Sequence, residues 1–280
     1  MIPEKLLLES VQKNVATALE EDLGPGDITA SLIEGNPLIT ANIISRQEAI
    51  FCGKLWVEET IRQIDEKISS KWNVDDGDQI RAKQLLFSLT GPAQPILTGE
   101  RTILNFCQLL SGTATKAHQY SKYVGNHSTQ ILDTRKTLPG LRIAQKYAVH
   151  CGGCTNHRLG LFDAYLIKEN HIISCGGIGN AVNSARKKHP NLEIEIEVES
   201  IAELLEAIDA KADIAMIDNF SSDMTNQAVK IAKGEIKLEA SGGIDQASIA
   251  EIAETGVDYI SIGALTKEVN PIDLSMRFET

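Results

Sequence analysis

The second half of the sequence alternates short apolar segments with amphipathic ones, and this rhythm limits the folds available to the chain. From residue 129 onward, helical patterns separate six apolar segments. These segments are TQILD, AYLI, IEIEVE, DIAMID, IKLEAS and DYISIG. Strands that alternate with helices of this length are typical of a parallel sheet with right-handed crossovers. The sheet is either an open doubly wound sheet or a closed barrel.

Two of these segments, IEIEVES and IKLEAS, alternate polar with apolar residues. The polar members are Glu193, Glu195, Glu197, Glu199, Lys237, Glu239 and Ser241. An open α/β sheet carries helices on both faces and reads apolar throughout. A barrel carries helices only outside, so alternate residues can be polar and face a functional interior. An exposed edge strand is the alternative explanation, but the pattern favours the barrel.

The part of the chain before residue 129 has a different, mixed pattern. It predicts helices over residues 4–21 and 54–66, and strands near 38–45, 68–74 and 84–90. A long helical pattern follows from Thr98 to about Val124, with only Gly112 interrupting it. We therefore expect a smaller mixed α/β domain over residues 1–110 and a barrel domain over 111–269. The long helix would join the two, and the tail 270–280 would rejoin the first.

Composition narrows the classes of partner. The net charge is −11, so nucleic acid and anionic membrane surfaces are not expected partners. The first residues carry charges at Glu4, Lys5 and Glu9, unlike a secretory signal, and no apolar run approaches the length of a membrane span. A cytoplasmic location is expected. Between Arg135 and His171, six Lys and Arg residues accompany two acids, which indicates a site for a small anion.

Polar or glycine residues follow every predicted barrel strand, where barrel enzymes carry their active sites. They are Asp133–Lys136, Lys168–His171, Glu197, Asp218–Asn219, Ser241–Gly243 and Gly263. SGGI and SIGAL each supply backbone N–H groups before a helix, a pattern typical of a phosphate site. The arginines, lysine and histidine of TRK and NHR indicate a ligand with several negative groups.

Two carboxylates at these strand ends allow more than one role. Glu197 and Asp218 could chelate Mg²⁺, which prefers oxygen ligands and is often shared with substrate phosphates. They could also face a positive charge that develops during a reaction. Ion pairing with a barrel lysine such as Lys168 is the structural alternative.

The segment HCGGCTNHR contains a CxxC pair, Cys151 and Cys154. A zinc site usually has a second pair at a defined spacing, and none exists here. A thioredoxin-like CxxC follows a strand and opens a helix, whereas this one follows the predicted helix 139–150. An anion-binding loop is therefore favoured over a metal or redox role.

The order of these motifs resembles one family, the quinolinate phosphoribosyltransferases. The resemblance is carried by TRKTLPGLR, GGCTNHRLGLFDAYLIKENHI, IEVES, AMIDNF, EASGGI and SIGALT, together with EEDLGPGDITA and GERTILNFCQLLSGTAT near the N-terminus. It covers nearly the whole chain. One departure is Cys154, where the family more often has a third glycine, which concerns only the detail of the loop.

The resemblance implies an incomplete α/β barrel, a homodimer, and transfer of phosphoribosyl from phosphoribosyl pyrophosphate (PRPP) to quinolinate with loss of CO₂ and with Mg²⁺. It implies that quinolinate contacts Thr134, Arg135, Lys136, His157 and Arg158, and that Arg101 completes the neighbouring subunit's site. Lys168, Glu197 and Asp218 would be catalytic, the two acids also holding the metal. The 5′-phosphate would contact Ser241, Gly242, Gly243, Ile262, Gly263 and Ala264.

Three alternatives remain open from the sequence. A sibling transferase of the same fold would use nicotinate or another base without releasing CO₂. A non-catalytic phosphosugar-binding protein would keep the phosphate site alone. A metal-binding module would depend on the two cysteines of the CxxC pair.

Overall fold

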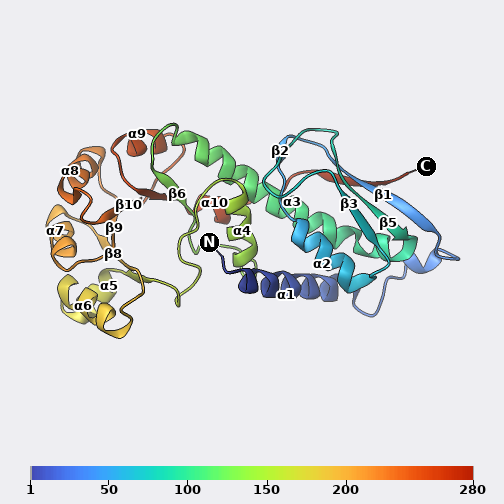
Figure 1. Ribbon diagram of the computed structural model, residues 1–280, viewed down its shortest axis with the longest axis horizontal. Coiled ribbons are helices and arrows are strands. Elements are labelled where there is room, and N and C mark those ends of the chain that lie inside the picture. Colours follow the sequence, from blue (N-terminus) through green and yellow to red (C-terminus); the bar gives the residue numbers. More distant parts are fainter. Residues whose placement is uncertain (1, 280) are drawn as a thin grey trace. The chain divides into compact units, whose positions relative to one another are not determined.

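The computed structural model describes residues 2–279, which form two compact units (Figure 1). The first unit comprises the chain up to His118, Thr137–Gly153, and the chain from Leu265 onward. The second comprises Gln119–Lys136 and Cys154–Ala264. These units differ from the expected boundaries in three places: the first unit extends to residue 118 rather than 110, it resumes at 265 rather than 270, and it includes Thr137–Gly153. Residue 1, which begins the expected first domain, and residue 280, which ends the expected tail, lie outside the described range.

The first unit is built on a four-stranded antiparallel sheet in the order β12-β1-β5-β3. Its strands are β1 Leu38–Ser45, β3 Ser69–Trp72, β5 Leu85–Pro92 and β12 Leu274–Phe278. Two short strands, β2 Ala49–Ile50 and β4 Gln79–Ile80, form a separate antiparallel sheet. Fully buried Phe51, Val57 and Phe87 belong to the core of this unit. Because β12 pairs with β1, the C-terminal segment completes the sheet.

Helices α1 Glu4–Leu23, α2 Lys54–Ile64 and α4 Arg142–Cys151 also belong to the first unit. Helix α1 buries Val11, Val15 and Leu19, which recur every four residues along one face. The long helix α3, Ala93–Tyr123, begins five residues before the expected start. Its Gly112 is required because an added Cβ would lie 2.2 Å from the carbonyl oxygen of Asn270.

The second unit contains six parallel strands in the order β6-β11-β10-β9-β8-β7. The strands are β6 Gln130–Leu132, β7 Tyr165–Ile167, β8 Ile194–Val198, β9 Ile214–Asp218, β10 Lys237–Ser241 and β11 Tyr259–Ser261. Figure 1 shows the sheet curving round, with α6 to α9 on its outer side. Among the described residues β6 and β7 are its two edges, and a bridge from Leu132 to Thr155 extends the β6 edge. The sheet is therefore an incomplete barrel.

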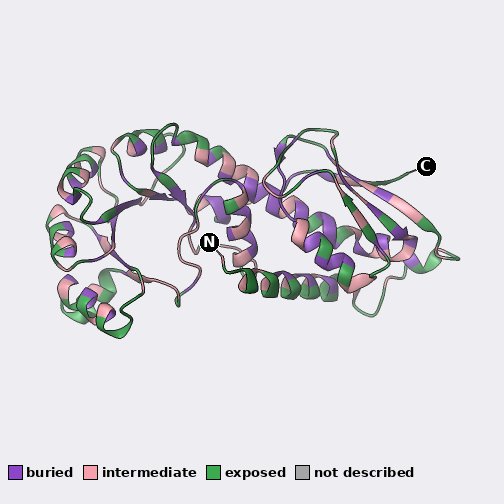
Figure 2. Ribbon diagram, viewed as in Figure 1, coloured by how far each residue is buried: buried purple, intermediate pink, exposed green. Residues whose placement is uncertain are grey.

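Outer helices cover the convex side of this sheet. They are α6 Ile178–Lys188, α7 Ile201–Asp209, α8 Ser222–Ala232 and α9 Ile249–Glu254. Helix α5 Glu169–Cys175 precedes α6, and the short α10 Ala264–Lys267 belongs to the first unit from Leu265 onward. Small apolar side chains such as Ala181, Ala207 and Ala228 are buried on these helices. Figure 2 shows buried stretches of the outer helices in purple. Ser200 and Ser221 cap α7 and α8 by accepting a backbone N–H three residues on.

Polar and apolar residues alternate in β8 and β10 because both strands are internal strands of the barrel sheet. Ile194, Ile196 and Val198 are buried, and so are Glu195 and Glu239. Both strands have a neighbour on each side, so neither is an edge strand. The barrel prediction is confirmed, and the open doubly wound sheet is not formed. Within residues 2–279, no helix is both long and apolar enough to cross a membrane.

Candidate active site at the barrel rim

Most of the predicted site residues lie at the carboxyl ends of the six parallel strands, whereas His157 and Arg158 come from the loop between α4 and β7. Thr134, Arg135 and Lys136 follow β6, and Lys168 follows β7. Asp218 and Ser241 end neighbouring strands and are direct partners in the strand register. Since parallel strands point the same way, their ends share one rim of the barrel.

Arg135 follows β6, and Arg158 lies near it on the loop before β7, where its Nη1 donates to the carbonyl of Ala164 at 3.3 Å. Burial lowers the pKa of Arg158, and the nearby positive charge of Arg135 lowers it further. In the described structure the Nε atoms of both side chains are buried and have no hydrogen-bond partner. Buried donors without an acceptor are costly, and two such donors on like charges are costlier still. An anion between the guanidinium groups would satisfy both.

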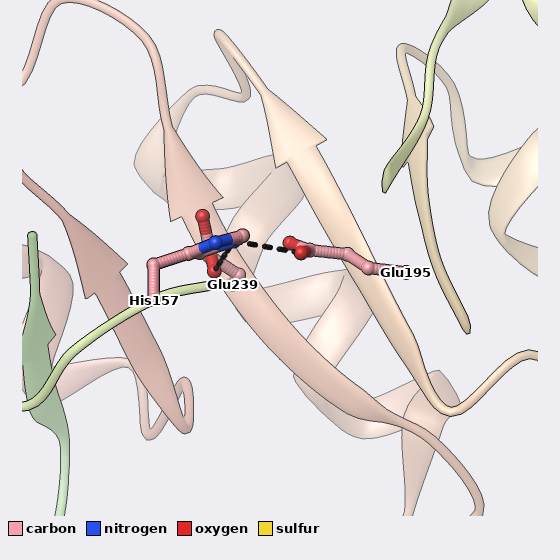
Figure 3. Close-up of side chains that lie close together, drawn as sticks. All are labelled: His157, Glu195 and Glu239. Carbon is pink, nitrogen blue, oxygen red and sulfur yellow. Dashed lines mark ion pairs between the residues drawn. The ribbon is translucent and has the colours of Figure 1, made fainter. Parts of the chain in front are cut away.

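His157 lies beside these arginines and is held between two buried glutamates (Figure 3). Its Nε2 lies 2.7 Å from Oε2 of Glu195 and 3.4 Å from Oε2 of Glu239. Burial acts to lower the pKa of His157, but the hydrogen bonds and charges of the two glutamates outweigh burial and raise the pKa to about 10. In a simple ion pair the pKa of Glu195 would fall. Burial and the like charge of Glu239 instead raise it to about 7.

Two further carboxylates, Asp133 and Asp163, fix the main chain of the same loop. Asp133, buried at the end of β6, accepts hydrogen bonds from the backbone N of His157 at 2.9 Å and from Nδ2 of Asn156 at 2.8 Å. Asp163 accepts from the backbone N–H groups of Leu159 and Gly160. Carboxylates therefore anchor the NHR loop at both ends.

The carboxylates predicted to be catalytic are paired with polar neighbours. Glu197 forms an ion pair with Lys168, and Oδ2 of Asp218 accepts from Nδ2 of Asn219 at 2.7 Å. The ion pairing that the sequence left open for Glu197 is thus present. Glu197 and Asp218 still offer oxygen donors on the adjacent strands β8 and β9, which is a donor set suited to Mg²⁺ shared with phosphates.

Two glycines bring the rim loops close together. A Cβ added at Gly242 would lie 2.3 Å from Oδ1 of Asn219 and 2.9 Å from Oδ1 of Asp218. A Cβ at Gly263 would lie 3.0 Å from Cδ of Lys136. The loop at Gly242 therefore approaches Asn219 and Asp218 too closely for a side chain of its own, whereas a side chain at Gly263 would require the Lys136 side chain to shift slightly. Gly242 and Gly243 also have positive φ angles, +91° and +58°.

The remaining predicted site residues, Ile262, Ala264 and Arg101, make few contacts that bear on their predicted roles. Ile262 is buried, and its N–H donates to the Leu132 carbonyl, while half-buried Ala264 begins α10. Arg101 lies in the first unit, is exposed, and contacts Glu100. Its predicted role in a neighbouring subunit stays a prediction.

The two cysteines of the CxxC pair belong to different units, Cys151 to the first and Cys154 to the second. Burial raises the pKa of Cys154 to about 12, so this thiol stays protonated at neutral pH. Zinc binds the thiolate, so the environment of Cys154 favours a packing role in the loop.

Sequence reasoning gave no role to Asp133, Glu195 or Glu239. Asp133 was visible as a strand end, and the two glutamates were visible as polar members of alternating strands. The missing information was which side chain faces them across the barrel. That partner, His157, comes from a loop that is far away in the sequence from both glutamates.

Comparisons with known proteins identify relatives over most of the chain. The family model for the quinolinate phosphoribosyl transferase N-terminal domain matches residues 27–111, and that for the C-terminal domain matches residues 113–277. A probable nicotinate-nucleotide pyrophosphorylase (carboxylating) of Bacillus subtilis is 42% identical over 257 residues, covering 91% of this chain and 89% of the relative. A quinolinate phosphoribosyltransferase (decarboxylating) of Nicotiana glauca is 35% identical, covering 95% of this chain and 81% of the relative.

Solved structures with a similar fold include proteins of the same name as these relatives. The nicotinate-nucleotide pyrophosphorylase of Francisella tularensis is 50% identical in sequence and superposes with a TM-score of 0.95. The alignment covers 100% of this chain and 98% of that chain. Human nicotinic acid phosphoribosyltransferase has a TM-score of 0.61 at 9% identity, covering 98% of this chain and 74% of that chain. This second likeness shows a shared fold alone.

Proposed function

The chain belongs to the quinolinate phosphoribosyltransferase family, and from this premise we propose the reaction that its barrel rim performs. The proposed reaction transfers phosphoribosyl from PRPP to the ring nitrogen of quinolinate, and releases pyrophosphate and CO₂ to give nicotinate mononucleotide. Such a reaction belongs to the biosynthesis of NAD. The observation that carries the proposal is the pair of half-buried arginines, Arg135 and Arg158, whose buried Nε donors have no partner in the described structure.

The two arginines suit quinolinate because it carries two neighbouring carboxylates. A guanidinium group donates parallel hydrogen bonds to a carboxylate in a fixed plane. One arginine for each carboxylate would relieve both the repulsion between the guanidinium groups and their unpaired donors. We assign Thr134, Lys136 and His157 to the same subsite, since each flanks one of the arginines in the chain.

The glycine loops suit the 5′-phosphate of PRPP. Ser241 ends β10 and is followed by Gly242 and Gly243, and Gly263 and Ala264 follow β11 after Ile262, whose own N–H donates to Leu132. These two loops lie at neighbouring strand ends, where backbone N–H groups can bind a phosphate. The chain of Lys136 passes over Gly263, with Nζ 3.8 Å from the position of an added Cβ. Its ammonium group can therefore balance charge near this loop.

The carboxylates of Glu197 and Asp218 are suited to stabilise positive charge at the reacting carbon of the ribose. Cleavage of the bond to pyrophosphate develops positive charge on the sugar, and fixed carboxylates stabilise such charge. We assign this role to Glu197 and Asp218, with Lys168 neutralising Glu197 until the substrate arrives. When bound by these two acids, Mg²⁺ would balance the charge of the pyrophosphate leaving group. Holding both anions in one site also removes much of the entropic cost of bringing them together.

We further propose that the active protein is a homodimer in which Arg101 completes the neighbouring site. Arg101 is exposed, and the only ion pair that the described structure gives it is with Glu100, the preceding residue. An arginine held this loosely is free to bind an anion on another subunit.

A product assay tests the proposal against its rivals. The protein is incubated with PRPP, Mg²⁺ and quinolinate labelled in the 2-carboxylate, and labelled CO₂ and nicotinate mononucleotide are measured. The proposal expects both products in equal amounts, and none from nicotinate. Turnover of nicotinate would identify a sibling transferase instead. Binding of PRPP without turnover of either base would identify a phosphosugar-binding protein.

A further inference from the structure

Asp133 is a buried acidic residue next to the proposed quinolinate subsite, and the proposed reaction gives it no role. It is 0% exposed and directly follows β6, two residues before Arg135. A buried carboxylate costs free energy unless hydrogen bonds satisfy its oxygens. The donors that satisfy Asp133 therefore indicate what this carboxylate holds in place.

Each oxygen of Asp133 accepts a hydrogen bond from the loop that carries Arg158. Oδ1 accepts from the backbone N–H of His157 at 2.9 Å, and Oδ2 accepts from Nδ2 of Asn156 at 2.8 Å. Hydrogen bonds to a charged acceptor are roughly twice as strong as those between neutral groups. One carboxylate thus joins the segment before Arg135 to the segment before Arg158.

The carboxylate extends a backbone connection between the same two segments. Strand β6 and the loop are bridged at Thr155, whose N–H donates to the Ile131 carbonyl at 2.9 Å and whose carbonyl accepts from the N–H of Asp133 at 3.1 Å. The Asp133 side chain carries this connection two residues further along the loop, to His157. The backbone bridge and the carboxylate together hold the loop against the end of β6.

Both arginines lie a short length of chain from this carboxylate. Arg135 follows Asp133 by two residues, which span at most about 7 Å, and Arg158 directly follows the hydrogen-bonded His157. Burial and the like charge of Arg135 lower the pKa of Arg158, so the two guanidinium groups are close enough to repel each other. A fixed point on the chain beside each arginine is needed to hold two repelling groups at one separation.

We propose that Asp133 is a positioning residue that sets the substrate specificity of the quinolinate subsite, by fixing the separation of the Arg135 and Arg158 guanidinium groups. This inference rests on the proposed function and adds to it the reason why one dicarboxylate is preferred. Quinolinate carries its two carboxylates on adjacent ring carbons. In pyridine-2,4-dicarboxylate, which has the same charge, the two groups stand one ring carbon further apart. Two arginines held at a fixed separation therefore match quinolinate better than this isomer.

The test weakens the connection and leaves both arginines in place. In Asp133→Asn an amide nitrogen replaces one acceptor oxygen, so a donor faces either Nδ2 of Asn156 or the N–H of His157. Calorimetry measures the Kd of quinolinate and of pyridine-2,4-dicarboxylate. We expect quinolinate to bind about tenfold more weakly and the isomer to change little, so the preference for quinolinate falls about tenfold. In steady-state kinetics the KM for quinolinate should rise, while the KM for PRPP stays within about twofold.

A reciprocal exchange separates this hydrogen bond from a general loosening of the loop. Asn156→Asp alone places two carboxylates against each other, so it should also lower the preference for quinolinate. When Asp133→Asn is combined with Asn156→Asp, the new amide can donate to the new carboxylate while its oxygen accepts from His157. Most of the lost preference should then return, although each single variant has lost it.

Asp213→Asn is the matched control. Oδ2 of Asp213 accepts from the backbone N of Ile194 at 2.7 Å and from Nη2 of Arg186 at 2.8 Å, just before β9 begins and so at the opposite ends of the barrel strands. Loss of these bonds should lower the melting temperature and leave the isomer preference as in the unmodified protein. If Asp133→Asn does not fold, Asn156→Ala takes its place, because it removes one bond and keeps the buried carboxylate. We expect it to lower the preference about threefold.

Four results would overturn the inference: an unchanged isomer preference in the folded variants at 133 and 156, equal losses of affinity for both isomers, no recovery in the reciprocal exchange, or the same loss of preference in Asp213→Asn. If the unmodified protein turns over quinolinate but binds both isomers equally, the inference fails and the proposed function stands. If the unmodified protein neither binds nor turns over quinolinate, the proposed function fails instead.

Discussion

Replacement of Gly242 by alanine tests how closely the phosphate loop approaches the acidic residues. The added Cβ would lie 2.3 Å from Oδ1 and 2.7 Å from Cγ of Asn219, and 2.9 Å from Oδ1 of Asp218. Ordinary contact begins at 3.4 Å, so Asn219 has to move by about 1 Å. Asn219 donates to Asp218, so this movement displaces the carboxylate that we assign to the metal and ribose.

The magnitude has two parts that can be separated. The φ angle of +91° strains alanine by about 1–2 kcal/mol, which would lower the melting temperature by a few degrees. Displacement of a catalytic group by about 1 Å lowers the rate by about 100-fold. Gly234 has a φ of +79° with nothing within 4 Å of an added Cβ, so Gly234→Ala carries the strain alone.

The assay measures kcat/KM for PRPP at saturating quinolinate, and the melting temperature, for both variants. We expect similar losses of stability, but a loss of about 100-fold in kcat/KM only for Gly242→Ala. Equal activity of the two variants would refute the reasoning that the loop and the carboxylate are in contact. A much lower melting temperature for Gly242→Ala alone would mean that the clash unfolds the unit rather than moving Asp218.

Three further predictions concern the charged residues. Arg135→Ala should weaken quinolinate binding by about 2–3 kcal/mol, roughly 30- to 160-fold, with PRPP binding little changed in calorimetry, and an equal loss for both would reject its role. Inactive Arg101→Ala and Lys168→Ala subunits, when mixed and allowed to exchange, should regain activity in heterodimers, whereas exchange without recovery would argue against a shared site. Glu197→Gln should lower kcat by about 10- to 100-fold with quinolinate affinity unchanged in steady-state kinetics, and an effect confined to KM would contradict a role in charge stabilisation.

Local patterns in the sequence predicted most elements because each reflects a short-range cause. The helix α6 occupies the predicted IGNAVNSARKK, and the period-two pattern of IEIEVES correctly indicated a barrel strand with a polar interior face. Helix α5 was not predicted. Its sequence ENHIISC is short and buries no side chain, so no apolar periodicity marks it. Strand β12 was expected only as a returning tail, since its pairing with β1 depends on residues more than 200 positions away.

The candidate site was predictable as a set of strand ends but not as a set of contacts. The position of Arg135 and Lys168 after strands follows from the alternation of elements. The partners of those side chains do not, because they depend on how the strands are ordered in the sheet. Glu239 illustrates this limit, since β8 and β10 are separated by β9 and only the curved sheet brings both glutamates to His157.

The central claim is that Arg135 and Arg158 each bind one carboxylate of quinolinate. A crystal structure of the quinolinate complex tests this claim most directly. We predict that one carboxylate lies within hydrogen-bond distance of the Arg135 guanidinium and the other of the Arg158 guanidinium, so that both buried Nε donors gain an acceptor. Quinolinate bound elsewhere, or bound with both arginine Nε donors still unpaired, would contradict it.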